Sequence, residues 1–514
     1  MSDPERQAAG ASARHIRGSS LLLFGKVISV GIGLATQVAL VRYLDKADFG
    51  AWGYAISVIS FFGTICTLGL ARSQTRFIPL YHEKGEFDRV FGTIALMLIT
   101  IISTSILIIS AIFLAPDVIT KLIGGDAQPV TLLFVMIFLV PVEAVDRVFE
   151  GLFASFNDAR TIFIRRHILS PVFRLVVVLL LIGLEQSVMF VAYGYLSTAI
   201  LGVLIYFGAF LKMARKEALI ANFRLNHIDI PAREIFTFSL PLMTSDLLAV
   251  LMHTSDTLLL GYFHDAEVIA SYQAILPTVR VNAMVMMSFS LLFTPMAARL
   301  FANDDRDGIN ALYWRTAIWL AVLTFPMLIL TFSLAQPLTL LLYGERYSDS
   351  WVFLSILGFA YYFNACLGFN GVTLKVLGKI KYIVLMNLAI AVLNVVLNLL
   401  LIPRHGALGA TIATAASMIV HNCLKQVGLK YLGGIKIFEA SYVPIYAMIF
   451  GSAVALFLIQ SIWQPNILVM FGAGALVSFM LLRASNRILD IQATFPELLK
   501  LPLMGKLLGV TRPR

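Results

Sequence analysis

Val41-Arg42-Tyr43-Leu44-Asp45-Lys46-Ala47-Asp48-Phe49-Gly50-Ala51 returns 219 residues later as Leu260-Gly261-Tyr262-Phe263-His264-Asp265-Ala266-Glu267-Val268-Ile269-Ala270. Each stretch has the pattern of an apolar helix end, a short polar turn and a new helix start. A second echo at almost the same offset pairs Leu179-Leu180-Leu181-Ile182 with Leu399-Leu400-Leu401-Ile402. Two matches at nearly one offset indicate an internal duplication.

The composition assigns the chain to the membrane. Hydrophobic residues make up 59% of its 514 residues, charged residues make up 13%, and the mean hydropathy is +0.86. Soluble domains carry about twice that charged fraction. Apolar runs near the ~20 residues that cross a bilayer recur along the chain. We therefore predict an all-α polytopic membrane protein with about 14 transmembrane helices, at residues 19–41, 49–71, 90–115, 129–155, 168–184, 188–211, 235–261, 268–297, 313–335, 350–372, 384–402, 408–430, 441–463 and 466–485.

The distribution of lysine and arginine predicts the orientation. With a cytoplasmic N-terminus, 30 of the 39 basic residues fall on the cytoplasmic side, 5 fall on the outer side and 4 lie inside helices. Short loops rich in these residues stay in the cytoplasm, so both termini are predicted to be cytoplasmic. The net charge of +10 then reflects topology and contact with lipid headgroups, and we expect no nucleic-acid partner.

The duplication predicts two pseudo-symmetric lobes of six helices. We place the N-lobe at residues 19–211, a basic cytoplasmic linker at 212–234 and the C-lobe at 235–430. Residues 1–18 read as a cytoplasmic tail, not a cleaved signal. Two further helices fill 441–485, and the cytoplasmic segment 486–514 is either an interfacial segment or simply a basic tail. The outer loops are short, so we expect no catalytic domain, and the three cysteines show no metal spacing, so we expect no metal or cofactor.

Charged side chains inside the predicted helices are the candidate site, because each costs at least ~2.5 kcal/mol in hydrocarbon. Glu143, Asp146, Arg147 and Glu150 form one polar stripe on the fourth helix, with Glu143 placed to pair with Arg147. A neutralised interior pair is the alternative to a functional site. The stripe should in either case face the protein interior or water.

Three cations have no acidic residue one turn away in their own helices: Lys26, Arg174 and Arg280. We predict that they meet an anionic group from outside the protein, unless acids on other helices pair with them. The predicted anion-binding residues are Lys26, Arg174, Arg280 and Arg147. The predicted polar or coupling residues of the cavity are Glu143, Asp146, Asp246, His253, Asp256, Gln37, Tyr272 and Asn282, for which ordinary helix packing and hydration are the alternatives.

Several motifs together resemble a known family. They are Leu40-Val41-Arg42-Tyr43-Leu44 with Asp48-Phe49-Gly50-Ala51-Trp52-Gly53-Tyr54, then Leu68-Gly69-Leu70, Thr75-Arg76-Phe77-Ile78-Pro79, Asp256-Thr257-Leu258-Leu259-Leu260-Gly261-Tyr262-Phe263, and Leu400-Leu401-Ile402-Pro403 with Gly406-Ala407-Leu408-Gly409-Ala410. This pattern, over about residues 20–430, resembles the polysaccharide-biosynthesis membrane proteins. These are the Wzx-type flippases of the multidrug/oligosaccharidyl-lipid/polysaccharide exporter superfamily.

The resemblance implies two six-helix lobes in a V around a cavity that faces either side of the membrane in turn. It implies a polyprenyl-diphosphate-linked glycan as substrate, a bacterial cytoplasmic (inner) membrane as location, and a polysaccharide polymerase and glycosyltransferases as partners. Lys26 stands at about the place where the lipid II flippase branch carries an arginine. The positive charge is kept, but the bidentate fork is lost.

Three alternative functions stay open. A multidrug or toxin cation antiporter of the same superfamily would need an acidic cavity, against which Lys26 and Arg280 argue. A lipid II flippase shares the expected chemistry. A membrane glycosyltransferase or polymerase would present acidic, histidine or arginine groups in a sizeable outer loop, for which the short outer loops leave little protein.

Overall fold

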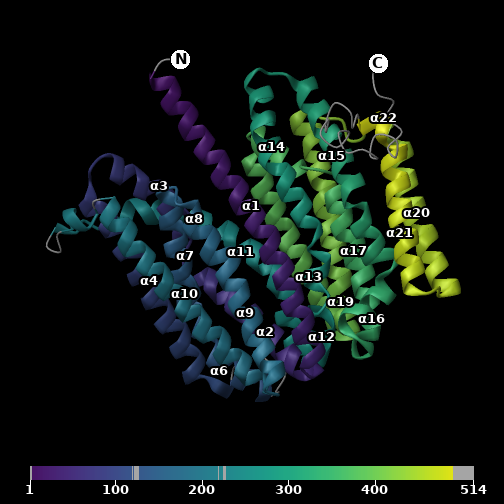
Figure 1. The fold of residues 1–514 in the computed structure, drawn as a ribbon, viewed down its shortest axis with the longest axis horizontal. Coiled ribbons are helices and arrows are strands. Elements are labelled where there is room, and N and C mark those ends of the chain that lie inside the picture. Colours follow the sequence, from purple (N-terminus) through teal and green to yellow (C-terminus); the bar gives the residue numbers. More distant parts are fainter. Residues whose placement is uncertain (1–2, 118–119, 121–126, 218, 224–226, 490–514) are drawn as a thin grey trace. The chain divides into compact units, whose positions relative to one another are not determined.

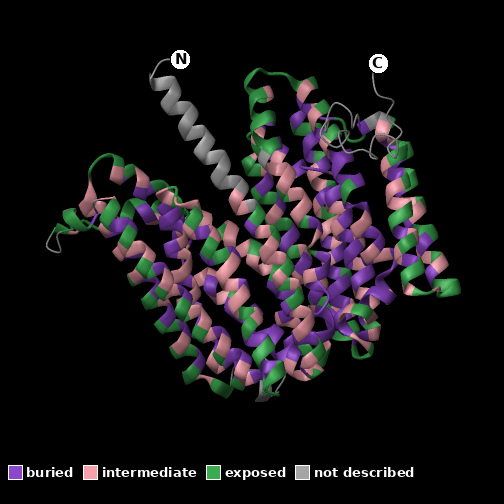
Figure 2. Ribbon diagram, in the orientation of Figure 1, coloured by how far each residue is buried: buried purple, intermediate pink, exposed green. Residues whose placement is uncertain are grey.

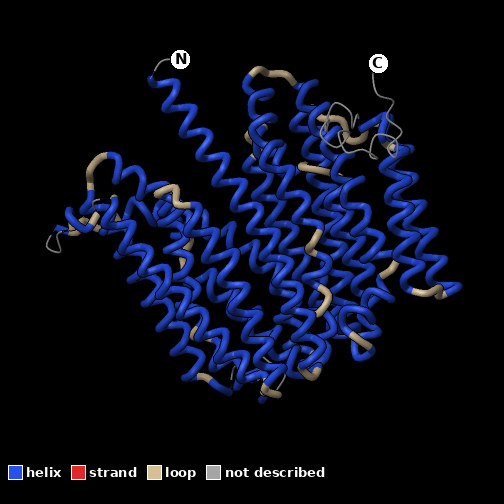
Figure 3. Tube along the Cα trace, in the orientation of Figure 1, coloured by secondary structure: helices blue, strands red, loops and turns tan. Residues whose placement is uncertain are grey.

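The computed structural model describes residues 3–117, 120, 127–217, 219–223 and 227–489, and these form helices joined by short loops, without a strand (Figures 1 and 3). Within these ranges, 11 helices are long and apolar enough to cross a membrane, or up to 12 if the bent pair 266–290 and 292–302 is one span. The predicted all-α class is confirmed. The predicted number of 14 spans is not.

Besides the bent pair, the difference in number arises at two places. The predicted spans 384–402 and 408–430 both lie on one 54-residue helix, α19 (Ile380–Gly433), which is interrupted at Gly406 with φ 52° and ψ −129°. That backbone conformation favours glycine, which has no Cβ to clash. The predicted span 129–155 is divided into α6 (Ala127–Met136) and α7 (Leu139–Ser155), each shorter than a membrane span.

The chain folds as two compact units, Met1–Gln273 and Ala274–Arg514, here called unit 1 and unit 2. The predicted lobe boundaries at 211 and 235 rest on the duplication and stay a prediction. The predicted N-terminal tail is helical from residue 3 on, and residues 490–514 of the predicted C-terminal tail lie outside the described residues. Besides α6 and α7, unit 1 contains α1 (Asp3–Tyr43), α2 (Lys46–Cys66), α3 (Leu70–Glu83), α4 (Phe87–Leu114), α8 (Ala159–Ile162), the π-helix η1 (Phe163–Leu169), α9 (Ser170–Gly183), α10 (Val188–Lys216), η2 (Ile220–Asn222), α11 (Ala232–Phe263) and α12 (Ala266–Gln273).

Both copies of the repeated stretch form the predicted helix break. α1 ends at Tyr43 and α2 begins at Lys46, while α11 ends at Phe263 and α12 begins at Ala266. In unit 1, α2 packs against both α11 and α12. Small residues permit this close approach: a Cβ built on Gly50 would lie 1.7 Å from the carbonyl oxygen of Ala266. As a result, 67% of the α2 span is buried inside the protein.

Unit 2 is organised around α15 (Arg306–Leu328), of whose span 67% is buried (Figure 2). Phe325 of α15 and Tyr362 share one hydrophobic cluster with Ile445 and Ile449. The helices of the predicted segment 441–485 therefore pack on this core. The other elements are α13 (Leu276–Val279), α14 (Asn282–Ala302), the π-helix η4 (Ile329–Ser333), α16 (Ala335–Tyr343), η5 (Glu345–Ser350), α17 (Trp351–Cys366), α18 (Asn370–Val376), α19, η6 (Ala440–Tyr442), α20 (Val443–Trp463), α21 (Ile467–Ala484) and α22 (Asn486–Leu489).

Candidate functional site

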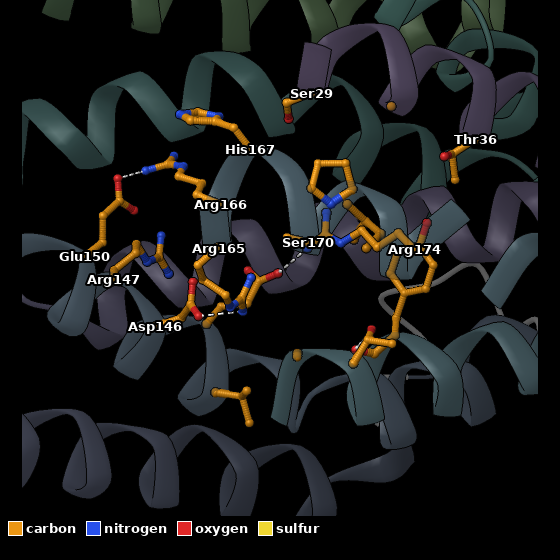
Figure 4. A pocket seen from close by; sticks show the side chains of 18 of the residues that line it. Ser29, Thr36, Asp146, Arg147, Glu150, Arg165, Arg166, His167, Ser170 and Arg174 are labelled. Atoms are coloured by element: carbon orange, nitrogen blue, oxygen red, sulfur yellow. Dashed lines mark hydrogen bonds and ion pairs between the residues drawn. The ribbon is translucent and has the colours of Figure 1, made fainter. Parts of the chain in front are cut away.

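A cavity of about 550 Å³ lies within unit 1, among α1, α2, α7, the continuous α8–η1–α9 segment and α10 (Figure 4). Five basic side chains line it against three acidic ones, which leaves an excess of two positive charges when its histidine is neutral. Charges are tolerated at membrane depth where they line such a cavity. The charged lining residues are Lys26, Arg147, Arg165, Arg166, Arg174, Glu143, Asp146 and Glu150, and the polar and aromatic ones include Ser29, Thr36, Gln37, Trp52, His167, Ser170, Tyr195 and Thr198.

The acidic stripe of α7 faces this cavity, and each of its three acids pairs with an arginine of the η1–α9 segment. Asp146 accepts from Arg165 at 2.7 Å, and Glu150 pairs with Arg166. The guanidinium of Arg174 lies 3.5 Å from the Glu143 carboxylate. These three pairs neutralise the acidic side chains of the cavity, and Figure 4 marks the contacts of Asp146 with Arg165 and of Glu150 with Arg166 by dashed lines.

The predicted pairing of Glu143 with Arg147 is wrong. Glu143 is held by Arg174 of α9, and Arg147 turns to α2, where its Nη2 donates to the carbonyl of Gly63 at 3.1 Å. Gly63 makes room for this contact, since a Cβ there would lie 2.8 Å from Nη2. The spacing on α7 permits a pair between Glu143 and Arg147, but each of the two side chains instead contacts a group on a neighbouring helix.

Sequence reasoning missed Arg165, Arg166 and His167, because it began the fifth helix at residue 168. The helical segment in fact begins at Ala159, where Asp158 Oδ1 accepts from the backbone N–H of Thr161 at 3.1 Å. The turn residues Asn157 and Asp158 were the available signal for this helix start. The π-helical turn of η1 then places three consecutive side chains in the cavity lining.

Arg165 is the most deeply buried of these cations, with a side chain only 6% exposed. Its guanidinium lies 5.3 Å from the centre of the Tyr206 ring, in the space left by Gly202, where a Cβ would come within 1.7 Å of Nη2. A buried charge is stable only when it is paired. Asp146 supplies that pair.

We expect Arg165→Leu to lower the free energy of unfolding by about 2–3 kcal/mol, because it leaves Asp146 without its partner. This is somewhat below the ~3–5 kcal/mol of a fully buried pair, since the Asp146 side chain keeps 24% exposure. The double variant Arg165→Leu/Asp146→Leu should recover much of the loss. Thermal unfolding in detergent, analysed as a double-mutant cycle, measures the coupling. Additive effects of the two substitutions would contradict it.

Lys26, Arg147 and His167 are the basic groups of the cavity that these three ion pairs leave without a carboxylate. Lys26 is half-buried on α1, and no ion pair joins it to a carboxylate among the residues that the structure describes. His167 is only 7% exposed, and its Nδ1 lacks a hydrogen-bond partner in the described part of the chain. Lys26 and Arg147 provide the positive charge that no acid of the cavity neutralises, and His167 adds a ring nitrogen without a partner among the described residues.

The remaining predicted residues of unit 1 separate into two groups. Gln37 lines the cavity, and its contact with a substrate stays a prediction. Asp246 instead pairs with Arg72 of α3, and His253 is exposed on α11. Asp256 is buried and accepts from the hydroxyl of Tyr272 at 2.6 Å.

Arg280 and Asn282 belong to unit 2, outside this cavity. Arg280 is exposed at the end of α13, and Asn282, at the start of α14, is 2% exposed. A role for either in substrate binding stays a prediction. Among the described residues, no three His, Cys, Asp or Glu side chains are grouped so that they could hold a metal ion.

Comparison with known families gives two matches. The model of a family described as "Polysaccharide biosynthesis protein" matches residues 15–301, and the model of a family described as MatE matches residues 241–400. The two matches together span both units.

Three curated relatives have low sequence identity to this chain, and two of them match it over most of its length. An uncharacterised membrane protein of Methanocaldococcus jannaschii is 22% identical over 78% of this chain and 80% of its own length. The lipid II flippase MurJ of Bacillus subtilis is 22% identical over 79% of this chain and 81% of its own. The capsular polysaccharide biosynthesis protein CapF of Staphylococcus aureus is 23% identical over 37% of this chain and 48% of its own.

Solved structures share the fold. The lipid II flippase MurJ in an inward closed conformation has a TM-score of 0.69 at 15% identity, covering 91% of this chain and 99% of that one. An inward-facing multidrug resistance MATE family transporter of the MOP superfamily has a TM-score of 0.63 at 14% identity, covering 79% and 96%. Each likeness shows the fold alone, and both agree with the predicted all-α fold class.

Proposed function

This chain belongs to the polysaccharide biosynthesis protein family, and on that premise we propose that it is a flippase for a polyprenyl-diphosphate-linked glycan. It would move the oligosaccharide or repeat unit from the cytoplasmic to the outer leaflet by alternating access. The observation that carries the proposal is the charge of the unit 1 cavity, where the three acids are already paired and Lys26 is not. A diphosphate is an anionic group that such a site attracts.

The cavity also suits the glycan that follows the diphosphate. A sugar head group carries many hydroxyls, and each one left unpaired in hydrocarbon costs a few kcal/mol. Ser29 and Gln37 of α1 offer hydrogen bonds along one side of the cavity. Trp52 and Tyr195, in edge-to-face contact with ring centres 4.6 Å apart, offer an apolar wall for the C–H faces of a sugar ring.

A cation exporter fits this cavity less well. A cationic substrate would have to displace Arg165, Arg166 and Arg174 from their carboxylates before it met any free negative charge. Each displacement would leave a guanidinium unpaired in a partly buried site, which is costly. We therefore favour an anionic substrate.

Flipping in proteoliposomes tests the proposal directly. Vesicles that contain the purified protein are loaded with a fluorescent polyprenyl-diphosphate oligosaccharide or, in parallel, with lipid II, and an impermeant quencher reports the outer leaflet. We expect protein-dependent exchange of at least one of the two lipids. Exchange of neither, together with uptake of cationic dyes, would support the antiporter instead. Faster exchange of lipid II than of the oligosaccharide lipid would assign the chain to the lipid II type.

Membrane potential should assist export. An inside-negative potential favours outward movement of a diphosphate with about two negative charges by ~4–5 kcal/mol at 100 mV, at ~2.3 kcal/mol per charge. We expect a several-fold faster outward rate when a potassium diffusion potential is imposed with valinomycin. The same vesicles with potassium on both sides are the control. Equal rates under both conditions would remove the potential as a driving force.

The proposal also includes a location and partners. We propose that both termini lie in the cytoplasm, as the excess of basic loops on that side predicts, and that the chain lies in the inner membrane of a bacterium. A polymerase and glycosyltransferases that make and consume the lipid-linked glycan are the expected functional partners.

A further inference from the structure

We propose that unit 2 carries a second binding site, for a neutral sugar residue, separate from the charged cavity of unit 1. A cavity of about 310 Å³ lies where η4, α16, the start of α17 and the end of α20 meet. This volume is at the lower end of the ~300–1,000 Å³ of small-molecule sites. None of its lining residues is charged, so its chemistry suits an uncharged ligand.

One side of this cavity is aromatic. The rings of Phe332 and Phe457 are stacked with their centres 5.3 Å apart, and Trp351 lies 6.5 Å from Phe457. Ser333 fixes this arrangement, because its hydroxyl donates to the carbonyl of Ala453 at 2.7 Å and so holds η4 on α20. Aromatic faces of this kind pack against apolar surfaces, including the C–H face of a pyranose ring.

The polar groups of this cavity include three side-chain amides, those of Gln336, Gln460 and Gln464. None of them is hydrogen-bonded to a residue that the structure describes. Gln460 is only 8% exposed, and its Oε1 is buried without a partner. An unpaired buried polar atom costs ~1–3 kcal/mol. Ligand hydroxyl groups, which both donate and accept, would satisfy these amides.

The backbone is irregular at both ends of this cavity. Phe332 and Ser333 belong to the π-helix η4, and π-helical turns occur frequently at functional sites. The charged cavity of unit 1 likewise contains a π-helix, η1. Gln464 ends α20 with φ 44°, a left-handed conformation that is uncommon for a residue other than glycine. Aromatic rings and free amides around an uncharged cavity together point to a sugar, since a phosphate or carboxylate would find no cation in the lining.

The orientation inferred from the basic loops puts this end of unit 2 on the outer side of the membrane. A transported glycan could reach the site from that side, and this use of the site rests on the proposed function. Sugar binding itself does not.

Saturation-transfer NMR on the full chain in phosphatidylcholine nanodiscs tests this site. The probes are the methyl glycosides of glucose, galactose, mannose and N-acetylglucosamine. We expect saturation of the protein to reach the ring C–H protons of at least one of them. Gln460→Leu and Trp351→Leu should each weaken that binding by about tenfold, the effect of one lost hydrogen-bonding or stacking contact.

Matched variants separate this site from others. Trp463→Leu changes a tryptophan at the same end of α20 that is 75% exposed and outside the lining, so it should leave binding unchanged. Trp351→Phe keeps an aromatic ring and should retain binding, which guards against a folding defect in Trp351→Leu. Lys26→Ala should slow flipping by about 10- to 100-fold while sugar binding persists. The proposal is overturned if no glycoside receives saturation, if Gln460→Leu and Trp351→Leu bind like the wild type, or if Lys26→Ala abolishes the signal.

Discussion

Lys26→Glu is expected to reduce flipping to the level of protein-free vesicles, and Lys26→Ala to reduce it by about 10- to 100-fold. In the proposed complex the Lys26 ammonium donates to a phosphate oxygen, and a hydrogen bond to a charged group contributes ~1.5–3 kcal/mol. Charge reversal adds repulsion to that loss. Arg147 and Arg174 would then have to hold the diphosphate alone, and Arg174 is already engaged by Glu143.

Conservative replacement sharpens this test. Lys26→Arg keeps the positive charge and supplies a fork suited to phosphate, so it should retain most of the activity. Lys212→Ala is the matched control, because it removes an exposed lysine of α10 that does not line the cavity. Flipping is measured in proteoliposomes at equal protein content, with the monodispersity of each variant in detergent checked by gel filtration. Full activity of Lys26→Glu would remove Lys26, and with it the central observation, from the proposed mechanism.

Gly50→Ala is expected to destabilise the protein by about 3 kcal/mol, the upper end of the typical cost of overpacking. A Cβ on Gly50 would lie 1.7 Å from the carbonyl oxygen of Ala266 and 2.5 Å from its carbonyl carbon, both backbone atoms that no rotamer change can move. Overpacking of this kind costs 1–3 kcal/mol or more. The substitution would force α2 away from α12, and these are the helices that follow the two copies of the repeated turn.

The first helix offers a control of the same chemistry. A Cβ at Gly31 would meet no atom within 4 Å, so Gly31→Ala should leave stability within about 1 kcal/mol of the wild type, with any change a gain from the higher helix propensity of alanine. Unfolding temperature and monodispersity in detergent compare the two variants. Equal unfolding temperatures would show that α2 and α12 do not approach as closely as described.

The charged cavity shows which side-chain placements sequence reasoning can anticipate. An ionisable side chain in a long apolar run must face protein or water, whatever the neighbours are. That rule alone selected Lys26, Arg174 and the α7 stripe, all of which line the same cavity. It selected Asp246 and Asp256 equally, although these two are engaged by Arg72 and Tyr272.

The ion-pair partners within the cavity could not be predicted from the sequence. Helical spacing predicts contacts one turn apart, and by that rule Glu143 pairs with Arg147. In the fold, α9 brings Arg174 to Glu143, while Gly63 of α2 opens a place for Arg147. The choice depends on which neighbouring helix approaches, and no local pattern encodes that approach.

Hydropathy, loop charge and the repeated turn are properties of short segments, so the sequence by itself determined the helical class, most of the membrane segments and the two matching helix breaks at Tyr43 and Phe263. The tertiary structure decided the rest, because it depends on contacts between distant segments. It brought Arg165 to Asp146 across the cavity, stacked Phe332 on Phe457, and gave Gly406 the backbone conformation that interrupts α19. Each of these depends on which helices lie side by side and how closely their small residues let them approach.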